Sequence, residues 1–264
     1  MKPKPTFNEY PEWAKATLGV AYEKSQQNLY EACLRGARDH ASTLLRPLGE
    51  TILTSVTEKY RRETGSELLM PTTLAEAFEL HIKPFASAVD KSYRQNVNWN
   101  DNWDGPPDDG WVTPDNWLTR FNDTVRTSLI CKYLDGPRFL ALEIEAWAAE
   151  NGIKCRFYSQ QKEVGYCAYH VYLFPRVALL DVNWGDHEAE LSVEIQLSTQ
   201  LQEVMRALTH EHYEKDRISS HKTDEAWQWQ HTSDVFRARY ISHTLHLLEG
   251  IILELRDSRK GPQR

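Results

Sequence analysis

Asp135 has the residue type and the position of a cation ligand. It ends the stretch V-R-T-S-L-I-C-K-Y-L-D, which predicts a strand, and Gly136-Pro137 follows at once. A carboxylate at a strand end beside a turn can hold a hydrated divalent cation, because Mg²⁺ prefers oxygen ligands and takes few of them from the protein. An aspartate in this place can also form the turn or cap the next helix. The sequence leaves both interpretations open.

A second group of polar side chains lies in K-E-V-G-Y-C-A-Y-H, residues 162–170. Gly165 permits the backbone to approach a ligand closely, and Tyr166 offers an aromatic ring. Lys162 and His170 can supply charge or hydrogen bonds. The simpler interpretation of this segment is a loop glycine followed by an ordinary strand.

A third group lies in a predicted strand and in the helix that follows it. Residues 191–198 alternate between apolar and polar side chains, and successive side chains of a strand point to opposite faces. Glu194 and Gln196 therefore share the polar face, which either is solvated or faces a site. Thr199 followed by Gln202 is a capping-box pattern, which predicts that a helix begins there. Two further polar side chains lie off the apolar stripe of that helix: His210 and Tyr213.

These groups require a fold that contains both strands and helices. Apolar spacing predicts helices over about residues 10–65 and 74–93, and a last long helix over about 233–256. From residue 124 onward, strands and helices mingle without regular βαβ repetition. We therefore predict an α+β fold, in which a mixed β-sheet is flanked by helices, with a helical N-terminal region and a long C-terminal helix. The predicted regions are a helical part at 1–95, a Trp/Asp/Pro-rich loop at 96–116 and an α/β core at 117–264.

Four tryptophans punctuate the predicted loop and its end: Trp99, Trp103, Trp111 and Trp117. Asn, Asp, Gly and Pro dominate the rest of the loop and favour turns. The tryptophans could form a platform on which bases or sugars stack. We expect instead that they attach an irregular loop to the core.

Composition limits the class of protein. The formal net charge of −7 argues against a general nucleic-acid-binding coat, although it leaves room for a local basic site. No apolar run approaches membrane-spanning length, and no charged-then-apolar segment follows Met1. The four cysteines are scattered and form no C-x-x-C pair. We expect a cytoplasmic protein with reduced thiols and no membrane association.

Taken together, the three groups resemble the RelA/SpoT nucleotide pyrophosphotransferase family. Residues 162–170 are similar to its K-x-N-G-Y-x-S-x-H segment, and residues 193–199 are similar to its V-E-I-Q-I-R-T strand. Residues 123–136 resemble its D-x-x-G-x-R-I strand, which ends in a metal-binding aspartate. His210, Tyr213 and Lys215 fall at the spacing of its E-H-x-x-Y-x-K helix. The resemblance covers about residues 117–215, and the strand of Glu194 is its most specific part.

The resemblance implies an ATP-dependent pyrophosphokinase. Such an enzyme transfers the β,γ-pyrophosphate of ATP to the ribose 3′-hydroxyl of GDP or GTP, with Mg²⁺, and so makes the alarmone (p)ppGpp. It implies that Asp135 and Glu194 hold the metal, and that Glu194 also helps to remove the hydroxyl proton. Gln196 would orient the site, and Tyr166 would stack on the acceptor base. The other implied substrate-binding residues are Lys162, Gly165, His170, His210 and Tyr213.

The sequence departs from the family pattern at several positions that bind phosphate, while the metal and stacking residues are present. Five family residues are replaced here by Val164, Cys167, Ala168, Ser198 and Thr209. We identify no R-x-K-S segment, with which the family grips ATP. The candidates for that role are Arg120, Arg126, Lys132 and Arg138. The sequence therefore defines the type of reaction better than the identity of the acceptor nucleotide.

Three functions remain compatible with the sequence. The first is an alarmone synthetase that uses a guanine nucleotide or makes an adenine analogue. The second resembles toxic small alarmone synthetases, which pyrophosphorylate the tRNA 3′ end or deplete ATP and have an antitoxin partner. The third is a noncatalytic nucleotide-binding module. A homo-oligomer is compatible with each of them.

Overall fold

The computed structural model describes residues 3–70, 78–161, 166–180, 186–208 and 227–259. The chain forms two units, and each takes three segments of the sequence. Unit 1 consists of Met1–Leu44, Leu80–Arg126 and Phe174–Glu194. Unit 2 consists of Leu45–Glu79, Thr127–Leu173 and Ile195–Arg264.

The main sheet has five strands in the order β1-β2-β7-β4-β3. Their bounds are β1 His81–Ile82, β2 Val125–Cys131, β3 Lys154–Gln161, β4 Cys167–Phe174 and β7 Val193–Thr199. β1 pairs antiparallel with the beginning of β2, where His81 lies opposite Arg126. A separate antiparallel pair in unit 1 consists of β5 (Arg176–Leu180) and β6 (Asp186–Glu190).

The central strand β7 is covered on both faces. Its apolar residues are buried, as the alternation predicts, but Glu194 on the other face is only 4 % exposed. A solvated polar face is therefore the wrong interpretation of this strand. A carboxylate in such surroundings is costly unless it has polar partners, so Glu194 needs an explanation beyond packing.

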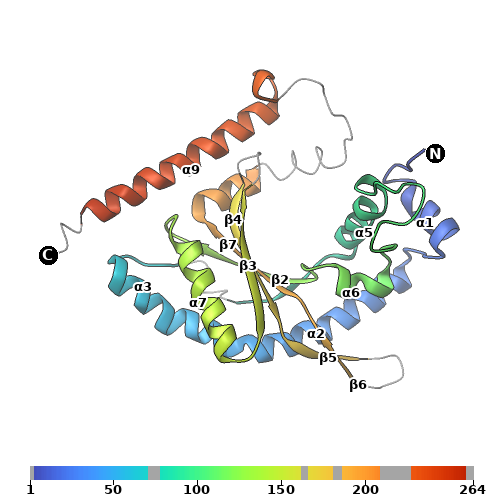
Figure 1. Ribbon diagram of the computed structural model, residues 1–264, viewed down its shortest axis with the longest axis horizontal. Coiled ribbons are helices and arrows are strands. Elements are labelled where there is room, and N and C mark those ends of the chain that lie inside the picture. The colour runs from blue at the N-terminus through green and yellow to red at the C-terminus, as the bar shows by residue number, and fades with distance from the viewer. Residues whose placement is uncertain (1–2, 71–77, 162–165, 181–185, 209–226, 260–264) are drawn as a thin grey trace. The chain divides into compact units, whose positions relative to one another are not determined.

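Helices flank the sheet, and the predicted fold class is confirmed. They include α1 Tyr10–Leu18, α2 Lys24–Thr51, α3 Thr57–Thr64, α5 Phe85–Tyr93, α6 Trp117–Arg120, α7 Gly136–Glu150 and α9 Asp234–Ser258. Short π-helical segments lie at Ile52–Val56 and Arg94–Asn98, and short 3₁₀-helices lie at Pro114–Asn116 and Trp227–Trp229. Residues 200–208 are also helical. α7 runs alongside β3 (Figure 1). None of the helices among the described residues has the length and apolar character that crossing a membrane needs.

Sequence signals explain where several of these helices begin. Ser233 caps α9 by accepting a hydrogen bond from the amide of Phe236 at 3.1 Å. α7 begins at Gly136, where an added Cβ would lie 2.7 Å from the Cβ of Cys131. Only glycine lets the start of α7 approach the end of β2 this closely.

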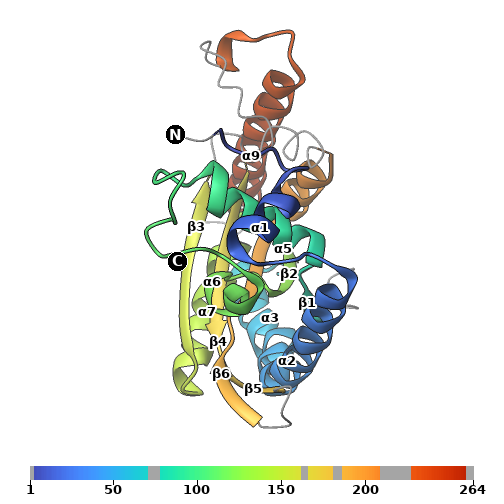
Figure 2. The ribbon, with the colours of Figure 1, turned by 90° about the vertical axis from the view of Figure 1, so that its right-hand side faces the viewer.

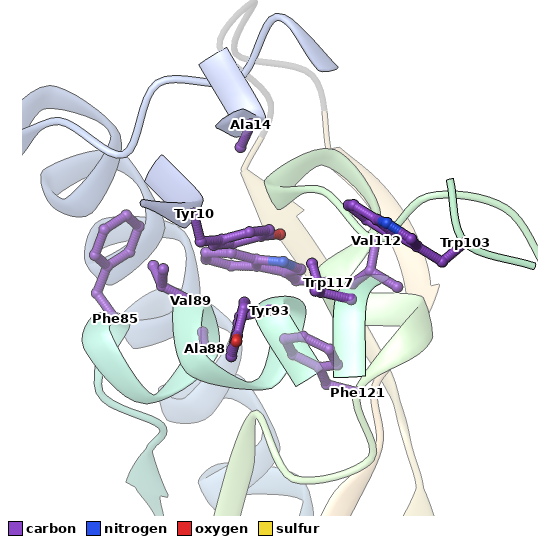
Figure 3. Close-up of a cluster of buried hydrophobic side chains, with 11 residues drawn as sticks. Tyr10, Ala14, Phe85, Ala88, Val89, Tyr93, Trp103, Val112, Trp117 and Phe121 are labelled. Carbon is purple, nitrogen blue, oxygen red and sulfur yellow. The ribbon is translucent and has the colours of Figure 1, made fainter. Parts of the chain in front are cut away.

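An aromatic cluster forms the core of unit 1. α1 and α5 lie side by side in this unit (Figure 2), and their inward side chains meet those of α6 and of the loop before it (Figure 3). Trp117 is fully buried there, stacks on Phe121 and donates its indole N–H to Ser92 at 2.6 Å. Trp103 is buried in the same cluster. The expectation that tryptophans attach the loop to the core is confirmed for Trp103 and Trp117.

Candidate functional site

The first residues of the neighbouring strands β2 and β7 lie side by side at one end of the sheet, within unit 1. The hydroxyl of Ser192, just before β7, donates to the backbone carbonyl of Asn122, just before β2, at 3.0 Å. Asp123 follows Asn122, and Glu194 lies two residues after Ser192. The structure therefore brings two carboxylate-bearing residues, Asp123 and Glu194, to the same end of two strands.

Asp123 lies between two lysines. Lys83 Nζ is 2.8 Å from one of its carboxylate oxygens, and Lys91 Nζ is 2.8 Å from the other. Burial alone pushes the pKa of Asp123 upward, but the two ammonium charges outweigh burial and hold that pKa at about 2. Burial also lowers the pKa of Lys83, and Asp123 opposes that shift. The three side chains form a charged group with one surplus positive charge.

Three neighbouring elements hold these lysines in place. The amide of Lys83 donates to the carbonyl of Thr124 at 2.8 Å, which extends the pairing of β1 with β2. The hydroxyl of Tyr30, on α2, donates to the carbonyl of Lys83 at 2.9 Å. Lys91 lies near the end of α5, and its ammonium group lies 4.8 Å from the ring centroid of Phe121. Both lysines are thus positioned by backbone and core rather than by flexible loops.

Lys83, Lys91 and Asp123 are functional candidates that the sequence reasoning missed, although signals for them exist. Residues 81–84 read H-I-K-P, which is similar to the R-x-K-S segment of the RelA/SpoT family at its lysine alone. Asp123 is the first residue of the segment that resembles D-x-x-G-x-R-I. The sequence pattern instead predicts Asp135, twelve positions later, as the metal-binding aspartate of that segment.

Asp135 occupies a different environment, in unit 2. It is the residue before α7, but its side chain makes no capping hydrogen bond to that helix. Its carboxylate accepts from the hydroxyl of Tyr60 at 2.8 Å and from both terminal nitrogens of Arg256, at 3.1 and 2.8 Å. A metal ion at Asp135 would have to compete with these donors. Asp135 and Glu194 belong to different units, so their sharing of an ion stays a prediction.

The side chains around Tyr166 form an aromatic cluster in unit 2. The ring of His170 lies beside those of Tyr158 and Tyr172, with ring centroids 5.9 and 6.4 Å away, and the two tyrosine rings lie 5.7 Å from each other. Tyr166 meets the edge of His170, and its hydroxyl lies 3.4 Å from His170 Nε2. Tyr158 is 46 % exposed, whereas His170 is buried. The exposed ring of Tyr158 offers this cluster a surface on which a base can stack, while the buried His170 is placed to hold Tyr166.

The remaining predicted site residues are placed as follows. Gln196 lies in β7 and is partly buried, and Arg126 lies in β2 opposite His81. Arg120 donates to the backbone carbonyl of Asp109 and lies 3.8 Å from its carboxylate. Lys132 and Arg138 belong to unit 2. The other predicted residues lie outside the described part of the chain: Lys162, Gly165, His210, Tyr213 and Lys215.

The carboxylates of Asp123 and Glu194 are ligands of the type that Mg²⁺ prefers, because this ion binds oxygen atoms. Mg²⁺ usually keeps several waters and takes one or two carboxylates together with substrate phosphates, so Asp123 and Glu194 would supply enough protein ligands. Within the described residues, no group of three or more His, Cys, Asp or Glu side chains could hold a metal ion. The described residues therefore do not form a metal site in which the protein supplies all the ligands.

Comparison with known proteins identifies the fold. The sequence matches no protein-family model and no curated protein. Small alarmone synthetase 1 from Bacillus subtilis, bound to its product pppGpp, is similar in structure with a TM-score of 0.52 and 17 % identity, over 87 % of this chain and 97 % of that chain. The same enzyme bound to AMPCPP gives 0.50 and 16 %, over 87 % and 96 % of the two chains. The protein smu.1046c from Streptococcus mutans UA159 gives 0.51 and 13 %, over 83 % and 93 %. The chain therefore has the fold of the small alarmone synthetases, which is the RelA/SpoT-type fold that its sequence predicted.

Proposed function

We propose that this protein is a nucleotide pyrophosphokinase that transfers the β,γ-pyrophosphate of ATP to the ribose 3′-hydroxyl of a guanine nucleotide. The observation that carries the proposal is the charged group of Lys83, Lys91 and Asp123, at the strand edge that also holds Glu194. Its support from comparison is that small alarmone synthetase 1, which has this fold, binds pppGpp and AMPCPP.

Lys83 and Lys91 are the proposed contacts to the phosphates of ATP. Ammonium groups are strong partners of phosphate oxygens, and a surplus positive charge attracts the triphosphate. In the free protein both lysines are neutralised in part by Asp123. A bound triphosphate would take over these lysines and leave the carboxylate of Asp123 available to a cation.

Asp123 and Glu194 would hold Mg²⁺, which when bound neutralises charge on the transferring phosphates. Glu194 would in addition act as the general base that accepts the proton of the ribose 3′-hydroxyl. Positioning and charge neutralisation supply most of the catalysis in phosphoryl transfer. Rigid placement of the lysines by β1, β2 and α5 meets that requirement.

Tyr166 is the proposed contact to the acceptor base, on the part of the chain that belongs to unit 2. Stacking on a ring does not by itself distinguish guanine from adenine. We favour a guanine nucleotide because of the resemblance of residues 162–170 to the family segment, and the acceptor has to be identified by experiment.

The deciding experiment supplies γ-labelled ATP and Mg²⁺ with GDP, GTP, ATP or tRNA as separate acceptors. Transfer of label to GDP or GTP is the expected result. Labelled tRNA or adenine nucleotide would replace the acceptor in the proposal, and nucleotide binding without any transfer would replace the enzyme by a binding module. Lys83→Ala and Lys91→Ala should each raise KM for ATP by about 10-fold or more, since charged hydrogen bonds contribute roughly 1.5–3 kcal/mol. Lys15→Ala, on α1 at an exposed position, serves as the matched control.

A further inference from the structure

We infer that Glu249, on α9, is a positioning residue for the acceptor side of the proposed site. The inference rests on the proposed function, because it takes Tyr166 as the residue that contacts the acceptor. Glu249 lies in unit 2 together with Tyr166, Gln202 and Thr199. Neither the sequence pattern nor the comparisons point to this residue.

A chain of hydrogen bonds leads from Glu249 to the residue after Tyr166. The backbone amide of Cys167 donates to Gln202 Oε1 at 3.4 Å, and Gln202 Nε2 donates to Glu249 Oε2 at 3.4 Å. The other carboxylate oxygen of Glu249 accepts from the hydroxyl of Thr199, the last residue of β7. Glu249 therefore connects α9 to the end of the strand that carries Glu194 and to the start of β4.

Both neighbours of Glu249 donate hydrogen bonds to it, so this position requires a side chain that accepts hydrogen bonds. An ionised carboxylate only accepts, so Gln202 must turn its NH₂ group toward Glu249. Its carbonyl oxygen then faces the amide of Cys167. The hydroxyl of Thr199 must likewise donate to Glu249, which leaves its lone pairs for the amide of Gln202, 3.4 Å away. Reversing the amide of Gln202 would place two donors against each other at Cys167.

Burial indicates that Glu249 does more than attach α9. The residue is only 7 % exposed, and the one other buried residue of α9 is Ser242. An apolar side chain would anchor a helix at lower cost, because a buried carboxylate loses its hydration and regains it only through well-placed partners. What a carboxylate adds over a leucine is the fixed orientation of Gln202 and Thr199. That orientation sets the backbone at Cys167, and with it the position of the Tyr166 ring.

The consequence is a selective effect on the acceptor. Glu249→Leu should weaken acceptor binding by about 10-fold, the loss that corresponds to one or two hydrogen bonds, and should leave binding of a nonhydrolysable ATP analogue within about 3-fold. Glu249→Gln should restore acceptor binding, because glutamine can still accept from Gln202 and can donate to Thr199 Oγ1. A residue that only stabilises the fold would affect both nucleotides alike.

The test is calorimetric titration of each variant with GDP and, separately, with the ATP analogue, alongside thermal unfolding. Glu254→Leu is the matched control, because it makes the same substitution at an exposed position of α9. Gln202→Met removes the hydrogen bonds to Cys167 and Glu249 without a substitution in α9. It should show the same selective loss of acceptor binding if Glu249→Leu fails to fold. Equal GDP affinity in the wild type, Glu249→Leu and Gln202→Met would overturn the inference, as would parallel losses for both nucleotides. Absence of any nucleotide binding by the wild type would instead overturn the proposed function.

Discussion

Arg256 contacts both carboxylate oxygens of Asp135, the residue that the sequence predicted as a metal ligand. The pair is bidentate, the guanidinium group is largely buried, and the hydroxyl of Tyr60 donates to the same carboxylate. Burial lowers the pKa of Arg256, but its hydrogen bonds to Asp135 and Asp257 outweigh burial and raise it. Bidentate pairs of this kind are among the stronger polar contacts in proteins. Within unit 2, Asp135 thus ties the last turns of α9 to the start of α7.

We predict that Asp135→Asn destabilises the protein whether or not Mg²⁺ is present. The variant leaves Arg256 without its charged partner, and the expected loss in the free energy of unfolding is about 1–3 kcal/mol. Urea unfolding in EDTA and in Mg²⁺ measures it. In a double-mutant cycle with Arg256→Gln, the double variant should lose less than the sum of the single losses. If Asp135 were a metal ligand, Asp135→Asn would instead have unchanged or higher stability in EDTA, and the variant would need more Mg²⁺ for activity.

We predict that the free energy of unfolding falls in acid because of Asp123. Its folded-state pKa of about 2 lies below the ordinary value of 3.8, so the unfolded chain takes up this proton first as the pH falls. The stabilisation is fully present above about pH 5 and disappears as the pH falls through 3.8 toward 2, and it amounts to about 2 kcal/mol.

Asp123→Asn should therefore flatten the pH dependence of unfolding between about pH 5 and pH 2, relative to the wild type. Urea unfolding at a series of pH values measures the slope. Asp115→Asn, at an exposed position of the same unit, is the control. An identical slope in Asp123→Asn and the wild type would show that the lysines do not hold this carboxylate ionised.

We predict that Glu194→Gln abolishes transfer and preserves the fold. The substitution keeps the shape of the side chain and removes the charge that would bind a cation and accept a proton. The turnover number should fall by about 100-fold or more, the usual contribution of a general base. Glu188→Gln, at an exposed position of β6, controls for loss of a charge in the same unit. Transfer at a near-normal rate by Glu194→Gln would remove Glu194 from the catalytic residues.

The local pattern of the sequence was sufficient to predict strand β7 and the beginnings of helices α7 and α9. Alternation predicts the direction of Val193 and Ile195 into the core, and the helix signals near Ser233 and Gly136 lie close to the observed ends. These features depend on neighbours in sequence. The position of Asp123 between Lys83 and Lys91 depends on residues 32 to 40 positions away. No local period encodes such a contact.

The apolar side of α9 shows the same limit. Periodicity places Leu247, Ile251 and Leu255 on an apolar side of this helix, yet all three are exposed within the described chain, and Glu249 is buried. Which side of a helix faces the protein depends on the partners that the fold supplies. The partners of Glu249 are Thr199 and Gln202, about fifty residues earlier. A search for amphipathic faces assigns a glutamate to solvent and therefore cannot find it.

We predict that the ring of Tyr166, and not its hydroxyl, binds the acceptor. Tyr166→Ala should weaken acceptor binding by roughly 1–3 kcal/mol, the usual contribution of stacking on one base. Tyr166→Phe should be mild, because phenylalanine keeps the ring that would stack on the base and loses only the hydroxyl, which lies near His170 Nε2. Tyr169→Ala is the matched control, since alternation along β4 places Tyr169 on the face opposite His170. Titration with GDP decides between the outcomes. Unchanged acceptor affinity in Tyr166→Ala would exclude stacking, and an equal loss in Tyr166→Phe would shift the role from the ring to the hydrogen bond with His170.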